Sequence, residues 1–202
     1  MRGVMTARIE NLKEICLFTA EDVAAMGIHA TTLGRWAKEG KIERVERGLF
    51  WHPNSALQED DLDYAIACRL FGPDAFIGGL TALSHYQLLD TAPKKIWVVV
   101  PHNKATTRKR FRLLHANRDA AIGVEKKRFY RISGLERTLA EALYYATKIG
   151  ADTALTSTMN AIHRKQTSPE KVLRMAAKLD IKSSVMRHWE ALISAQEVAQ
   201  SV

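Results

Sequence analysis

The spacing of apolar residues along 18–51 changes from a helical to a strand period, and it predicts two short helices followed by a β-hairpin. Thr19 and Asp22 have the spacing of a capping box, so the first helix is expected over 20–26. Gly27 tolerates the left-handed conformation in which helices commonly end. The chain should therefore turn sharply before the second helix begins.

The second helix is expected over 30–39, and Gly40 should close it. Leu33, Trp36 and Ala37 share one side of this helix at about 100° per residue, so that side should be buried. The opposite side is small, polar and basic. It carries Thr31, Arg35 and Lys38, and it is flanked by Thr32 and Glu39.

The residues that follow change to a period of two, which is typical of strands. A hairpin is expected over 42–51, with Arg44 and Arg47 near its tip. An amphipathic helix over 7–16 precedes these elements. The set has the layout of a winged helix-turn-helix, which we expect over residues 1–55.

This layout suits DNA because a major groove admits one α-helix, while a hairpin beside it can hold the backbone. The exposed helix side would contact base edges and backbone, and the two hairpin arginines would contact phosphates. The expected DNA-binding residues are Thr31, Thr32, Arg35, Lys38, Arg44 and Arg47. The alternative is a winged helix that only binds protein, because one fold serves several functions.

Residues 56–202 should form a second, mixed α/β domain with a small sheet and a helical tail. The apolar run 96–100 predicts a buried strand. Ser133 and Glu136 have the spacing of a capping box for the helix that follows. Further short strands are expected over 111–115, 121–124 and 128–132. The fold class is therefore α+β.

Positive charge is concentrated in one part of this second domain. The chain has a net charge of +8, and residues 102–131 hold ten Lys and Arg against two Asp and Glu. Such a segment is an exposed loop, a second nucleic-acid surface or a site for an acidic partner, and we favour binding of a polyanion. The residues of this secondary basic surface are Arg108, Lys109, Arg110, Arg112, Lys126, Lys127 and Arg128.

Composition argues against several other classes of protein. No apolar run approaches the roughly 18 residues of a membrane span, and the first residues lack a signal peptide's apolar core, so we expect a cytoplasmic protein without membrane contact. The seven histidines are scattered and form no pair with metal-ligand spacing. We therefore expect no metal, no cofactor and no enzymatic activity.

One pattern leaves a nuclease as the least favoured alternative. Pro73 and Asp74, followed by Glu125 and Lys127, imitate the P-D…(D/E)-x-K arrangement of metal-dependent nucleases. A helix and two strands are expected between the two carboxylates, and short patterns of this kind recur by chance.

The order of these features resembles the AbiEi family of antitoxins from type IV AbiE toxin–antitoxin systems. The resemblance rests on the GI-x-x-x-T-L-x-R run at 27–35, the G-x-I-x-R-V-x-R-G-L-F run at 40–50, Ala82-Leu83-Ser84-His85, the strand at 97–101, and Glu136-Arg137-Thr138-Leu139. The resemblance implies a transcriptional autorepressor that binds inverted repeats in its own promoter. It also implies a functional partner, a nucleotidyltransferase-like toxin, which is opposed without a necessarily stable complex. A winged-helix regulator without a toxin is the alternative.

Overall fold

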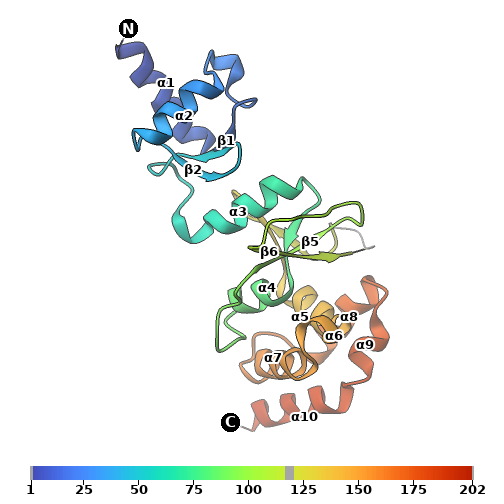
Figure 1. Ribbon diagram of the computed structural model, residues 1–202. Coiled ribbons are helices and arrows are strands. Elements are labelled where there is room, and N and C mark those ends of the chain that lie inside the picture. Colours follow the sequence, from blue (N-terminus) through green and yellow to red (C-terminus); the bar gives the residue numbers. More distant parts are fainter. Residues whose placement is uncertain (1, 117–120, 202) are drawn as a thin grey trace. The chain divides into compact units, whose positions relative to one another are not determined.

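The computed structural model describes residues 2–116 and 121–201, with the side chains of 2–8 left out (Figure 1). The chain divides into two compact units, Met1–Ile66 and Ala67–Val202. The division falls inside α3 (Glu59–Phe71), whereas the sequence places the domain boundary before that helix, at residue 55. Each unit combines helices with a sheet of its own, so the expected α+β class is confirmed.

The first unit is built around a three-stranded antiparallel sheet with the strand order β1-β3-β2. The central strand β3 is buried along its whole length, and β1 pairs with it from Leu17 opposite Trp51. The elements of this unit are α1 (Arg2–Ile15), β1 (Leu17–Thr19), the 3₁₀-helix η1 (Ala24–Met26), α2 (Ala30–Lys38), β2 (Glu43–Glu46) and β3 (Leu49–Trp51).

The α-helix expected over 20–26 is wrong, because only the short η1 forms there. The capping bonds do exist, with the Thr19 N–H donating to Asp22 Oδ2 at 2.7 Å. However, Thr19 is still part of β1, and between it and Gly27 only Val23 is buried. Too few residues and too little apolar surface remain for a longer helix. Gly27 closes η1 in the left-handed conformation, as expected.

The apolar stripe of α2 forms the centre of this unit's core. Leu33 and Trp36 are almost inaccessible to solvent and pack with Leu12 and Phe18. The hairpin turns at Gly48, whose φ of 79° favours glycine. A bulge shifts the pairing of the two strands before that turn.

The second unit contains a five-stranded mixed sheet with the strand order β6-β5-β4-β8-β7. Its central strand β4 pairs antiparallel with β5 and parallel with β8, while β5 and β6 are parallel. The strands are β4 (Phe76–Ile77), β5 (Ile96–Val100), β6 (Phe111–His115), β7 (Val124–Lys126) and β8 (Arg131–Ser133). The strands expected over 96–100 and 111–115 are confirmed, and the next two are displaced toward the C-terminus.

Most helices of this unit gather on one face of the sheet (Figure 1). They pack against Trp97 and Leu114, and the opposite face carries Phe111, whose ring meets Phe71 at a centroid distance of 5.3 Å. Cover on both faces explains why β5 is an uninterrupted apolar run. The helices are α4 (Gly79–His85), α5 (Leu135–Tyr144), α6 (Ala146–Ile149), α7 (Ala151–His163), α8 (Pro169–Lys178), α9 (Lys182–Met186) and α10 (Trp189–Gln200).

The capping box expected from Ser133 and Glu136 does not form. Gly134 is the N-cap of α5, and Ser133 lies in β8, where its Oγ is 2.7 Å from Thr138 Oγ1. Glu136 accepts a hydrogen bond from Thr167 Oγ1 at 3.0 Å instead. The side chains therefore connect different elements rather than capping the helix.

Candidate nucleic-acid interface

Helix α2 presents to solvent the side that the sequence assigns to DNA. Thr31, Arg35 and Lys38 are exposed and Thr32 is half-buried, while Leu33 and Trp36 face the core. These four polar residues therefore lie together on one accessible helix side.

A carboxylate to which the sequence pattern assigns no role lies at the end of this side. This carboxylate belongs to Glu39, the C-cap of α2. Its Oε2 forms an ion pair with Lys41 Nζ at 2.6 Å, and its Oε1 lies 3.8 Å from Arg35 Nε. The hydrogen bond from Lys41 lowers the pKa of Glu39, and the charge of Arg35 adds a smaller effect. The i,i+4 spacing of Arg35 and Glu39 was the signal for this ion pair. Because all three side chains are substantially exposed, Arg35 can exchange this partner for another anion.

The hairpin offers two cations and two carboxylates. Arg44, on β2, and Arg47, in the turn, are exposed as expected. Glu43 is also exposed and Glu46 is half-buried, so the hairpin has no net charge. It can therefore supply individual phosphate contacts rather than a strong field.

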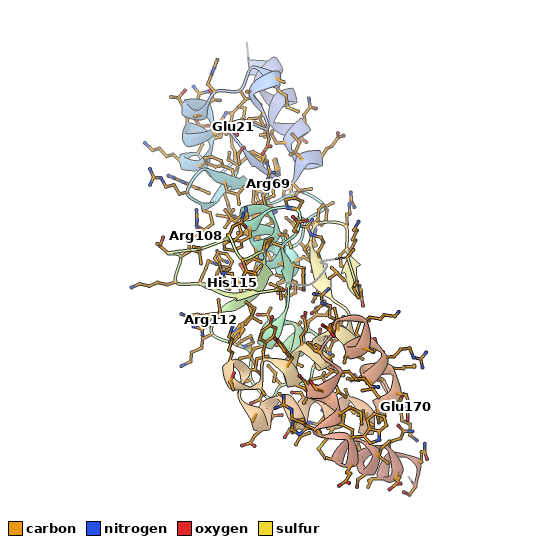
Figure 2. All side chains as sticks on the ribbon, turned by 90° about the vertical axis from the view of Figure 1, so that its right-hand side faces the viewer. Glu21, Arg69, Arg108, Arg112, His115 and Glu170 are labelled. Atoms are coloured by element: carbon orange, nitrogen blue, oxygen red, sulfur yellow. The ribbon has the colours of Figure 1, made fainter. Side chains whose placement is uncertain are left out.

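The structure separates the residues of the secondary basic surface into two groups. Arg112 lies on β6 and Lys126 on β7, which are the opposite edge strands of the five-stranded sheet. Four strand spacings of about 4.8 Å place these edges roughly 19 Å apart. The group of Arg108, Lys109, Arg110 and Arg112 lies at the β6 edge, where Figure 2 labels Arg108 and Arg112. The group of Lys126, Lys127 and Arg128 lies at the β7 edge.

The two groups differ in their contacts within the protein. The Arg112 guanidinium lies 5.7 Å from the Trp97 ring and remains exposed on the strand. Lys127 Nζ binds Glu125 Oε2 at 2.7 Å, and this hydrogen bond lowers the pKa of Glu125. Part of the charge at the β7 edge is therefore neutralised inside the molecule.

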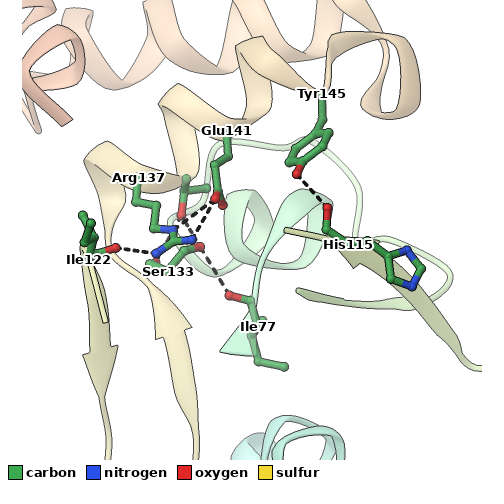
Figure 3. A network of polar contacts seen from close by, with 8 residues as sticks. Ile77, His115, Ile122, Ser133, Arg137, Glu141 and Tyr145 are labelled. Carbon is green, nitrogen blue, oxygen red and sulfur yellow. Dashed lines mark hydrogen bonds and ion pairs between the residues drawn. The ribbon is translucent and has the colours of Figure 1, made fainter. Parts of the chain in front are cut away.

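Helix α5 contains a buried ion pair that its apolar pattern does not predict. Arg137 is inaccessible to solvent, and its Nε and one terminal nitrogen donate to Glu141 Oε1 at 3.1 and 3.0 Å (Figure 3). A second terminal nitrogen donates to the Ile122 carbonyl, and the guanidinium lies 4.5 Å from the Phe76 ring. The i,i+4 spacing of Arg137 and Glu141 is the sequence feature that indicates this pair. The pair fastens α5 to the sheet and belongs to the core.

The geometry gives no support to the nuclease alternative. Asp74 lies in the turn before β4, while Glu125 lies on β7, two strands away in the sheet. Glu125 is already paired with Lys127, and its Oε1 accepts a hydrogen bond from the Tyr86 hydroxyl at 3.2 Å. Among residues 2–116 and 121–201, no three His, Cys, Asp or Glu side chains come together in a way that could hold a metal ion. Across the same residues, no helix combines the length and apolar character needed to cross a bilayer.

The fold as a whole resembles a solved structure of low sequence similarity. The crystal structure of the RV2827C protein from Mycobacterium tuberculosis matches with a TM-score of 0.61 and 13% sequence identity, over 92% of this chain and 75% of that chain. At this identity the match concerns the fold alone. No curated protein sequence matches the chain.

The sequence of the first unit matches a family model over residues 13–50, which run from the end of α1 to β3. The family is described as "Transcriptional regulator, AbiEi antitoxin". The match includes all six residues expected to contact DNA. Over residues 13–50, the first unit is therefore similar in sequence to the AbiEi antitoxin transcriptional regulators.

Proposed function

We propose that the first unit is a winged helix-turn-helix that binds duplex DNA through the exposed side of α2. The observation that carries the proposal is the orientation of this helix, whose Leu33 and Trp36 are buried while Arg35 and Lys38 face solvent. The strand order β1-β3-β2 and the hairpin after α2 agree with this fold. In this interface, Thr31, Thr32, Arg35 and Lys38 contact base edges and backbone, and Arg44 and Arg47 contact phosphates.

The biological role that we propose is that of an antitoxin and transcriptional autorepressor in the cytoplasm, without catalytic activity. The family match over 13–50 supports it. The target is then an inverted repeat in the protein's own promoter, read by two copies of α2. The functional partner is a nucleotidyltransferase-like toxin, and a gene for such an enzyme next to this one would distinguish an antitoxin from a regulator without a toxin.

A gel-shift assay with the gene's upstream region tests the DNA-binding proposal. The wild-type chain should retain the upstream fragment in the presence of excess random duplex. Arg35→Ala should weaken operator binding by about 1–3 kcal/mol if Arg35 makes a bidentate contact with guanine. It should weaken random-duplex binding much less.

The control is Lys13→Ala, which removes a cation from α1 that is paired with Glu10 at 2.5 Å. This variant should bind both duplexes like the wild type. An equal loss on operator and random DNA for Arg35→Ala would refute base reading by Arg35. Failure of the wild type to prefer its upstream region would refute the repressor role.

A second candidate is polyanion binding by the β6 edge of the second unit. It is favoured by the exposure of Lys109 and Arg112 beside the half-buried Arg108 and Arg110. Four cations along one sheet edge would contact a nucleic-acid backbone without reading its sequence.

A further inference from the structure

The outer side of α8 carries a row of positive charge with an apolar residue beside it. Lys171, Arg174 and Lys178 are exposed and, at about 100° per residue, fall on one side of the helix together with Met175. The inner side of α8 packs against α5, where Val172 is fully buried. The row is therefore a solvent-facing feature of a well-anchored helix.

A hollow of about 240 Å³ lies between this row and the first turn of α5. Its lining consists of Glu136, Lys171, Arg174, Met175 and Lys178. The Glu136 carboxylate is held in place because one of its oxygens accepts the Thr167 hydroxyl at 3.0 Å. The hollow thus combines three cations, one fixed carboxylate and one apolar side chain.

The three cations form no ion pair with any residue in 2–116 or 121–201. Arg174 does act at longer range on Glu170, whose pKa is lowered mainly by the hydrogen bond with Ser168 and to a smaller extent by the charge of Arg174. Arg174 and Lys178 are an i,i+4 pair of like charge, which destabilises a helix. An external anion at this row would relieve that repulsion.

We propose that this hollow and the row on α8 form a docking surface for an acidic helical segment of a partner protein. Lys171 and Lys178 are about 10 Å apart along the helix axis, so carboxylates at i, i+3 and i+7 of a second helix match the row. A basic residue beside those carboxylates matches Glu136, and Met175 supplies an adaptable apolar contact.

Nucleic acid fits this surface less well than protein does. A phosphate backbone is negative along its whole length, so Glu136 would repel it, and it offers no apolar group to Met175. The docking surface belongs to the second unit and does not depend on DNA binding by α2. Failure of one proposal therefore leaves the other standing.

Fluorescence anisotropy with the full chain and a designed probe tests the docking surface. The probe is a fluorescein-labelled helical peptide with glutamates at i, i+3 and i+7 and one lysine beside them. The first control probe has glutamine at the three glutamate positions and should bind much more weakly. The variant R174E/K178E should lose about tenfold in affinity for the glutamate probe, because two favourable surface charges become repulsive.

The matched control variant is K182E/R187E, which reverses two exposed cations on and directly after α9. It should bind the glutamate probe within about twofold of the wild type, because its charges lie outside the hollow. In a second variant, Glu136→Gln, the affinity for the glutamate probe should fall. The affinity of this variant for a probe with alanine in place of the lysine should equal that of the wild type.

Four outcomes would overturn the proposal. The wild type could fail to bind the glutamate probe, or it could bind the glutamine probe equally well. The two double variants could lose affinity equally. Finally, R174E/K178E could bind the glutamate probe as tightly as the wild type does and bind a random duplex more weakly. That result would make this row a nucleic-acid surface. Circular dichroism of each variant verifies that α8 and the remaining helices are intact.

Discussion

Single residues in this protein follow the apolar pattern closely except where charge is buried. Leu33 and Trp36 are buried as their spacing predicts. Arg137 is not exposed, although the apolar stripe of α5 leaves it on the polar side, because its guanidinium lies over Phe76 of β4 and α5 also packs against other helices. Periodicity assumes that one side of a helix faces water, and α5 violates the assumption from Arg137 to Leu143.

Removal of one member of the buried pair should be much more destabilising than replacement of both. Glu141→Ala leaves the Arg137 guanidinium buried without its carboxylate, so the free energy of unfolding should fall by about 3–5 kcal/mol. The free energy of unfolding should fall less in the double variant R137M/E141L. This variant removes both charges and leaves mainly the Ile122 carbonyl without a donor. Urea titrations followed by tryptophan fluorescence measure both. Equal losses would mean that the charge pair itself is not what the core depends on.

Whole elements are predictable where local pattern and packing agree. Helix α2 and strand β5 have strong apolar patterns, and both form where the sequence places them. The helix expected over 20–26 fails because Thr19 is already committed to β1, whose partner strand β3 lies about thirty residues later in the chain. Ser133 fails as a cap for a similar reason, because its hydroxyl bonds the Ile77 carbonyl of β4 at 3.3 Å. Local spacing carries no information on such distant partners.

Gly79, the first residue of α4, is required for two separate reasons that a matched pair of variants can distinguish. Its φ is 52°, and an added Cβ would lie 2.7 Å from Trp97 Cε3 and 3.0 Å from Leu114 Cδ1. Gly40, which follows α2, also has a positive φ of 69°, but nothing lies within 4 Å of a Cβ added there. Gly40→Ala should cost about 1–2 kcal/mol for the backbone alone, and Gly79→Ala should cost a further 1–3 kcal/mol or so for overpacking. Equal destabilisation in a denaturant titration would show that Trp97 moves aside freely.

Across the whole molecule, the residues proposed to read DNA and the charge that attracts it lie in different units. Residues 1–66 hold 8 Lys and Arg against 11 Asp and Glu, a net charge of −3. Residues 67–202 hold 22 against 11, a net charge of +11. Long-range attraction of a polyanion must therefore come from the second unit. The cations beside the edge strands β6 and β7 have a second candidate role, because charge on an edge strand prevents pairing with a second sheet.

The salt dependence of DNA binding separates these two roles. Changing Arg108, Lys109, Arg110 and Arg112 to alanine should weaken binding to operator and random duplexes about equally. It should also flatten the slope of log affinity against log salt by as much as about 4 if all four residues contact phosphates. The variant K126A/K127A/R128A is the comparison, and its slope should change less because Lys127 is already paired with Glu125. An unchanged slope in the first variant, together with increased self-association in light scattering, would assign those four cations to protection of the β6 edge rather than to DNA binding.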